Sequence, residues 1–124
     1  GHGTRLHEDT DLLHYVRDHR IPIEICLTSN VQTKAVAAYA EHPLRRYFDE
    51  GLVLSLNTDN RLMSGTTVTE EYWLAHQHLD FSWPELVDLA LMSFDSAFVP
   101  WDEKQALIRR VKQEIREIEA PRAV

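Results

Sequence analysis

The segment 52–60, with the sequence LVLSLNTDN, places a leucine at every second position from Leu52 to Leu56. A period of two predicts a β-strand whose leucine face packs against helices. The opposite face becomes more polar toward the end of the segment, which finishes near the carboxylate of Asp59. Parallel α/β sheets and barrels bind their ligands beyond the carboxyl ends of the strands, so Asp59 is a candidate functional residue. A polar turn after any strand gives the same pattern, and this segment alone leaves both interpretations open.

A second strand is predicted at residues 21–27, where isoleucine again occupies alternate positions. Between the two strands, the sequence predicts a polar turn at residues 28–30 and helices at residues 32–41 and 44–50. Two strands joined through helices form a crossover connection, which runs between parallel strands of one sheet. The chain is therefore expected to fold as an α/β protein.

Further helices are predicted from capping residues and from apolar residues at helical spacing. Thr10 is expected to cap a helix that runs to about residue 20. Capping-box patterns begin at Thr67 and at Ser82, and Gly51 is expected to end the helix before the second strand. These further helices cover residues 10–20, 67–79, 82–98 and 101–119.

The bulk composition narrows the class of protein. The chain has 124 residues, of which 44% are hydrophobic and 27% charged, as expected of one soluble globular domain. A formal net charge of −7 argues against binding to nucleic acid or to an anionic membrane surface. The apolar runs are too short to span a bilayer. Cys26 is the single cysteine, which excludes an internal disulfide and is consistent with a cytoplasmic location.

The number of predicted strands is too small for a complete parallel sheet. Residues 21–27 and 52–60 are convincing strands, and the residues that lead to His2 resemble the end of a third. Parallel sheets usually contain more strands and are covered on both faces, and a (β/α)8 barrel takes about 250 residues. We therefore expect this sequence to be the later part of a larger α/β barrel.

Three blocks of sequence resemble the adenosine deaminase family, a group of metal-dependent purine aminohydrolases. They are GHGTRL at residues 1–6, EICLTSNVQT at residues 24–33 and SLNTD at residues 55–59, and they follow the family's order. The resemblance implies that residues 1–124 are the C-terminal segment of a single barrel domain, a (β/α)8 TIM-type barrel that is incomplete as given. The segment would hold the end of strand 6 and strands 7 and 8 with their helices.

The resemblance also implies roles for individual residues. Asp59 corresponds to the aspartate that ligates the catalytic zinc, and we expect it to face His2 across a shared hollow. His2 corresponds to the catalytic histidine that orients and stabilises the attacking hydroxide. Asn60 stands where many members have a second aspartate, which binds N7 of the purine. The amide of Asn60 can donate a hydrogen bond through its NH2 group, so a substrate-binding role is retained.

The activity that the resemblance implies is the Zn2+-dependent hydrolytic deamination of adenosine and deoxyadenosine to inosine and deoxyinosine. The remaining zinc ligands and the proton-transferring glutamate are not in this chain, so the isolated chain is expected to be inactive. Two alternatives stay open: a catalytically silent interaction fragment, and a deaminase of another 6-aminopurine such as adenine or a modified nucleoside. Open strand edges and apolar helix faces predict self-association, or pairing with the N-terminal part of the barrel.

For several other residues the sequence gives weaker support for a role in the site. Ser29 and Asn30 are expected to cap the helix that follows their strand, with ligand contact as the alternative. Ser55 and Asn57 share the parity of Asp59 and are expected to support it. Cys26 is expected to pack as a small apolar side chain. The remaining histidines considered as ligands are predicted to be surface or partly buried residues: His14, His19, His76 and His78.

Overall fold

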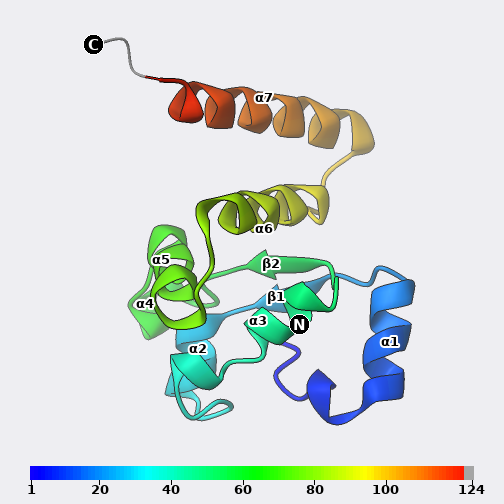
Figure 1. Cartoon of the computed structure of the whole chain (residues 1–124), viewed down its shortest axis with the longest axis vertical. Helices are drawn as coiled ribbons and strands as arrows, with labels where there is room; N and C mark the ends of the chain where they lie inside the picture. The colour runs from blue at the N-terminus through cyan, green and yellow to red at the C-terminus, as the bar shows by residue number, and fades with distance from the viewer. Residues whose placement is uncertain (122–124) are drawn as a thin grey trace.

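A sheet of two parallel strands lies at the centre of the computed structural model, which describes residues 1–121 (Figure 1). Strand β1 spans Ile23–Ile25 and strand β2 spans Leu54–Leu56, with Ile23 opposite Leu54 and Ile25 opposite Leu56. The predicted parallel crossover is thus confirmed. Both strands are shorter than their predicted segments, and single backbone hydrogen bonds extend the pairing at each end, from Ile23 N to Val53 O at 2.9 Å and from Asn57 N to Ile25 O at 2.8 Å.

The connection between the strands differs from the predicted one. A helix, α2, begins directly after β1 and spans Leu27–Gln32, where the sequence predicted a polar turn followed by a helix over residues 32–41. The residues that follow form turns and a short 3-10 helix, η2, at Tyr39–Glu41. Polar residues at 28–30 favour turns in isolation, but here they are buried and bonded to distant groups, so tertiary contacts override that preference.

Local capping signals fix most of the other helices. Asp9, rather than Thr10, caps the helix α1 by accepting a hydrogen bond from Leu12 N at 3.0 Å. Thr67 caps α5, and Ser82 forms the predicted capping box of α6. The bounds are η1 Leu6–Glu8, α1 Thr10–Asp18, α3 Leu44–Asp49, α4 Arg61–Ser64, α5 Val68–Leu79, α6 Trp83–Asp95 and α7 Trp101–Glu119. The helix predicted to reach residue 98 therefore ends at Asp95.

The hydrophobic core forms around the sheet and under α5 and α6. All three residues of β2 are buried, so the alternation seen in the sequence does not translate into one exposed face. Helix α6 packs on β2, and α2 lies away from α6, below β1, in the view of Figure 1. The fully buried side chains that fill this core include Leu13, Ile25, Leu27, Leu44, Tyr47, Leu54, Ala75, Phe81 and Leu89.

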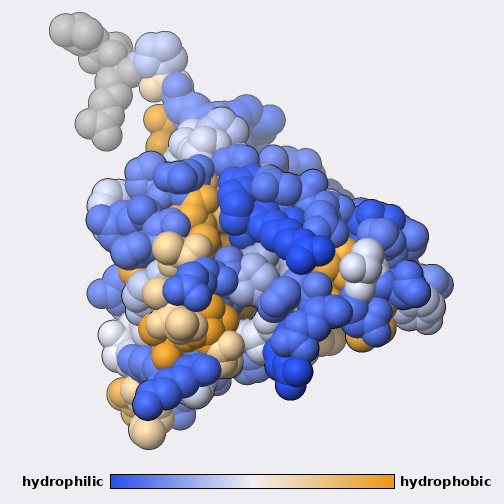
Figure 2. Space-filling view, turned by 60° about the horizontal axis from the view of Figure 1, so that its bottom comes forward, coloured by the Kyte–Doolittle hydropathy of each residue, from blue (hydrophilic) through white to orange (hydrophobic). Residues whose placement is uncertain are grey.

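Helix α7 is the outermost helix, and its main packing partner among the described elements is α6. Within the described part of the chain it contributes no buried residue. Apolar residues elsewhere also reach the surface, and Figure 2 shows them gathered in patches bordered by polar residues. The exposed aromatic side chains of the described residues include Trp73, Trp83, Phe98 and Trp101. None of the helices in residues 1–121 is both long and apolar enough to cross a membrane.

Candidate active site

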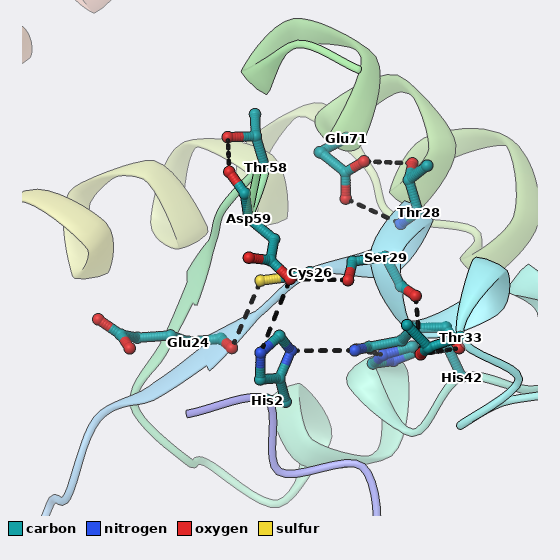
Figure 3. Close-up of polar contacts among 11 residues, drawn as sticks. His2, Glu24, Cys26, Thr28, Ser29, Thr33, His42, Thr58, Asp59 and Glu71 are labelled. Carbon is teal, nitrogen blue, oxygen red and sulfur yellow. Dashed lines mark hydrogen bonds and ion pairs between the residues drawn. The ribbon is translucent and has the colours of Figure 1, made fainter. Parts of the chain in front are cut away.

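Asp59 and His2 face each other at the carboxyl end of the sheet (Figure 3). The Oδ2 atom of Asp59 lies 4.0 Å from Nε2 of His2, and both side chains remain about half exposed. They line a cavity of about 360 Å³ together with residues from β1, from the end of β2 and from the start of α5. The geometry therefore brings together two of the residues singled out in the sequence, His2 from the N-terminal loop and Asp59 from the turn after β2.

The N-terminal loop that carries His2 is tied to β1 by its backbone. His2 N donates a hydrogen bond to Glu24 O at 2.9 Å. The next residue, Gly3, has a φ of +63°, and a Cβ atom there would lie 2.6 Å from Cγ2 of Ile23. The hydroxyl of Tyr47 donates to Gly3 O at 2.6 Å and holds the loop from the other side. Glycine is thus required by both the backbone angle and the lack of space.

The carboxylate of Asp59 is oriented by α2. Ser29 Oγ donates a hydrogen bond to Asp59 Oδ2 at 2.8 Å. The backbone of Asp59 has a φ of 56°, in the left-handed region that aspartate tolerates better than most residues. The side chain is therefore held by a neighbour while its backbone turns the chain from β2 toward α4.

Asn30 performs the equivalent task for His2. Its Nδ2 atom lies 3.0 Å from His2 Nδ1, and its Oδ1 atom lies 3.0 Å from Nε2 of the buried His42. The capping role predicted for Ser29 and Asn30 is wrong, because Cys26 occupies the N-cap position of α2 and both polar side chains turn into the site. Their place directly after β1 was the sequence signal for this role.

Asn60 serves as the N-cap of α4. Its Oδ1 atom accepts hydrogen bonds from Leu62 N and Met63 N, both at 3.1 Å. The side chain is exposed and follows Asp59 in the chain, but Asn60 is not among the residues that line the cavity. Because the carbonyl oxygen of the amide is used by the cap, the NH2 group is the part of Asn60 that remains for a ligand.

The residues predicted to support Asp59 from β2 bond to each other instead. Asn57 Nδ2 donates to Ser55 Oγ at 2.8 Å.

Cys26 is buried, and its burial raises the pKa of its thiol to about 11, with a further contribution from the negative charges of Asp59 and then Glu71. The thiol of Cys26 therefore stays protonated near neutral pH and packs as an apolar side chain, as predicted.

Glu71 is a buried acid whose contacts to the site were not predicted from the sequence. Its Oε2 atom accepts a hydrogen bond from Thr28 N at 3.2 Å, and Oε1 accepts from the hydroxyls of Thr66, at 3.0 Å, and of Thr28. These bonds tie the first turn of α2, which carries Ser29, to α5. Glu71 precedes the buried Ala75 by four residues, so its place on the buried stripe of α5 could have revealed it.

The donor set suits one side of a zinc site. Zinc in proteins is usually held by three or four side chains from histidine, cysteine or carboxylates. In residues 1–121, no three such side chains come together. Asp59 nevertheless presents a half-exposed carboxylate to the cavity, with an imidazole close by. These residues fit a metal whose other ligands come from outside this segment.

Comparison with known proteins agrees with this geometry. Residues 1–114 match the family model described as "Adenosine deaminase". An adenosine deaminase of Klebsiella pneumoniae subsp. pneumoniae is 41% identical over 111 residues, which are 90% of this chain and 33% of that protein. The crystal structure of an adenine deaminase from Arthrobacter aurescens superposes with a TM-score of 0.87 at 32% identity, covering 93% of this chain and 35% of that one.

A more distant structure has the same fold. A cog1816 amidohydrolase from Burkhoderia ambifaria, with bound Zn, gives a TM-score of 0.83 at 21% identity and covers 95% of this chain and 33% of that one. The chain thus spans about a third of the length of the proteins it matches. Its two strand–helix units are part of a (β/α)8 barrel, as predicted.

Proposed function

Because the chain belongs to the adenosine deaminase family, we propose that residues 1–124 form the C-terminal segment of the barrel domain of a zinc-dependent deaminase. The proposed reaction is the hydrolysis of adenosine or deoxyadenosine to inosine or deoxyinosine, with release of ammonia. The observation that carries the proposal is the convergence of Asp59 and His2, 4.0 Å apart, in one cavity at the carboxyl end of the sheet. This is where barrel enzymes place their catalytic residues.

In this proposal each residue of the site has a separate task. Asp59 holds the zinc ion together with ligands from the rest of the barrel, and Ser29 keeps its carboxylate in place. Zinc, when bound, makes water a nucleophile near neutral pH. His2 orients the attacking oxygen toward C6 of the purine and stabilises the charge that develops there. The NH2 group of Asn60 donates a hydrogen bond to N7.

A second candidate is a deaminase of another 6-aminopurine, such as adenine or a modified nucleoside. The similarity to an adenine deaminase at a TM-score of 0.87 supports it. So does Asn60, which stands where the family's usual residue is an aspartate. A panel of adenosine, deoxyadenosine, adenine and N6-methyladenosine, each compared by kcat/KM on the full-length protein, separates the two candidates.

We also propose a cytoplasmic location and association of this segment with the N-terminal part of the barrel or with a second copy. The buried Cys26 is consistent with a reducing compartment. Within residues 1–121, β1 and β2 pair only with each other as strands, so β2 has an edge available for a further strand, and the outer edge of β1 holds only the hydrogen bond from His2 N. Exposed tryptophans on α5 and α6 add apolar surface that an associated segment could cover.

The experiment that tests the proposed function replaces Asp59 by asparagine in the full-length protein. Zinc content is measured by elemental analysis, and adenosine deamination by the change in ultraviolet absorbance. We expect Asp59→Asn to lose bound zinc and to lower kcat/KM by more than about 100-fold, since even residues that only support metal ligands cost 10- to 100-fold. Asp95→Asn, at an exposed aspartate at the end of α6, is the matched control and should change neither property. Full zinc content and activity in Asp59→Asn would overturn the proposal.

A further inference from the structure

A chain of hydrogen bonds leads from a backbone amide in the core to His2. It begins at Leu44 N, which donates to Nδ1 of His42 at 3.0 Å. A backbone N–H group can only donate, so Nδ1 of His42 must be unprotonated. His42 is 3% exposed, and burial lowers its pKa to about 4, which keeps the ring neutral near neutral pH. The single proton of this neutral ring therefore lies on Nε2.

The next link fixes the orientation of an amide. Nε2 of His42 lies 3.0 Å from Oδ1 of Asn30, and its N–H group donates to that oxygen. Because the oxygen of the Asn30 amide faces His42, the NH2 group must face the other way. That NH2 group lies 3.0 Å from Nδ1 of His2. Figure 3 shows that the ring of His2 points its other nitrogen toward Asp59.

We infer that Asn30 and His42 are positioning residues that fix the tautomer of His2, leaving its proton on Nε2, the atom that faces Asp59. An NH2 group can only donate, so Nδ1 of His2 accepts and the neutral ring carries its proton on the opposite nitrogen. Free imidazole has both tautomers available. In this chain the tautomer of His2 is set by the backbone N–H group of Leu44, acting through the side chains of His42 and Asn30.

The consequence for catalysis rests on the proposed function. Nε2 lies 4.0 Å from Oδ2 of Asp59, so an oxygen bound beside Asp59 meets an N–H donor rather than a lone pair. His2 then acts by donating a hydrogen bond to the attacking oxygen and not by removing its proton through Nε2. The contacts to Asn30 and to the backbone of Glu24 hold the ring in that orientation.

The tautomer can be measured without turnover. In the 15N-labelled chain at about pH 8, above the usual pKa of histidine of about 6.5, long-range 1H–15N correlations distinguish protonated from unprotonated ring nitrogens. We expect His2 to show a protonated Nε2 and an unprotonated Nδ1. Asn30→Asp keeps the size of the side chain but presents only acceptors to Nδ1, and we expect it to move the proton of His2 to Nδ1.

A second pair of variants tests His42 and guards against a change in folding. In His42→Gln the new amide can still donate to Asn30 Oδ1, and His2 should keep its tautomer. His42→Phe removes the donor, and His2 should show a mixture of tautomers. His14→Gln, at an exposed histidine of α1, is the matched control and should leave the His2 signals in place, whereas His2→Gln identifies those signals by removing them. Circular dichroism verifies that each variant is folded, and a variant that does not fold alone is measured in the full-length protein with labelled histidine.

A protonated Nδ1 in the unmodified chain, or an unchanged tautomer in both Asn30→Asp and His42→Phe, overturns the inference. In the full-length protein we further expect Asn30→Asp to lower kcat for deamination by about 10- to 100-fold, as for other residues that orient a catalytic group, with a smaller effect on KM. Absence of deaminase activity with the expected tautomers would refute the proposed function while leaving the inference intact.

Discussion

Ser29 and Asp59 are 30 positions apart in the chain, yet Ser29 Oγ donates a 2.8 Å hydrogen bond to Asp59 Oδ2. The bond joins the first turn of α2 to the turn that follows β2. The two partners follow the two parallel strands, so the bond lies at the carboxyl end of the sheet. In the proposed enzyme this bond orients the carboxylate that holds zinc.

Replacement of Ser29 by alanine tests this support. We expect Ser29→Ala to lower zinc affinity or kcat/KM of the full-length protein by about 10- to 100-fold, because an unsupported carboxylate loses its fixed orientation. Zinc titration and initial rates measure the two effects. The matched control is Ser96→Ala, since the buried Ser96 hydroxyl has no hydrogen-bond partner within the described residues. That control should keep full activity and be neutral or slightly stabilising, and an equal loss in both variants would argue against a specific role for Ser29.

The buried carboxylate of Glu71 is expected to matter for stability. Glu71→Gln places an NH2 group where the carboxylate accepted from Thr28 and Thr66, so at least one donor loses its partner. We expect a loss of about 1.5–3 kcal/mol in the free energy of unfolding, measured by urea denaturation. Glu70→Gln, one position away and exposed, should change it by less than about 0.5 kcal/mol. Similar effects of the two variants would show that the buried bonds contribute little.

The stability of the fold should depend on pH through the titration of the buried His42 ring. Burial lowers its pKa to about 4, whereas an unfolded histidine has a pKa of about 6.5. The unfolded state therefore binds the proton more tightly. The neutral ring of His42 therefore contributes its full stabilisation above about pH 6.5, and this stabilisation is lost as the pH falls toward 4. We expect a loss of about 2 kcal/mol between pH 7 and pH 5, at about 1.4 kcal/mol for each pKa unit.

Urea denaturation of His42→Gln at the same two pH values identifies the source of this loss. The variant lacks the titrating ring, so most of the difference should disappear. Glu85 does not interfere, because Arg45 and the Ser82 backbone lower the pKa of its carboxyl to about 2. The stability that Glu85 contributes is lost only below its ordinary pKa of about 4.3. An unchanged pH dependence in His42→Gln would assign the effect to other groups.

The loop that carries His2 depends on Gly3. Gly3→Ala combines a φ of +63° with a contact of 2.6 Å between the new Cβ and Ile23 Cγ2. Gly51→Ala is the matched comparison, since Gly51 has a φ of +80° but no atom within 4 Å of a Cβ. Backbone strain alone costs about 1–2 kcal/mol, so Gly3→Ala should be more destabilising than Gly51→Ala in thermal denaturation. It should also displace His2, seen as a shift of its NMR signals that Gly51→Ala does not produce.

The 124-residue chain by itself should not deaminate adenosine. Asp59 and His2 converge at its site, but in residues 1–121 no group of three side chains is arranged to hold a metal ion. Zinc is rarely held by so few ligands. The purified chain, freed of host enzymes and supplied with zinc, should give no inosine by chromatography. Sustained turnover that copurifies with this chain would contradict the expectation.

The sequence predicted the features that depend on neighbouring residues. The capping box at Ser82, the cap at Thr67 and the helix end at Gly51 were all predicted, because each signal lies within one turn of the helix that it ends or begins. The parallel pairing also followed from the length and content of the connection. The convergence of Asp59 with His2 was expected from the family resemblance rather than from spacing.

The remaining features depend on partners that are distant in the sequence. Asn30 bonds to His2 across 28 positions, and Glu71 bonds to Thr28 across 43. Local preference assigned residues 28–30 to a turn, since nothing nearby in the sequence shows that their polar groups find buried partners. The helix α2 exists because those partners satisfy the polar side chains that would otherwise favour a turn.

In the proposed enzyme, the cap that Asn60 provides for α4 has a consequence for the purines that the site would bind. With its Oδ1 committed to Leu62 N and Met63 N, the side chain can offer a ligand only N–H groups. A ring nitrogen with a lone pair can accept a hydrogen bond from this NH2 group. A C–H group in the position of that nitrogen cannot accept one and leaves the amide without a partner. An analogue in which carbon replaces N7 should therefore bind more weakly than its parent nucleoside, and the lost affinity reports directly on a helix cap.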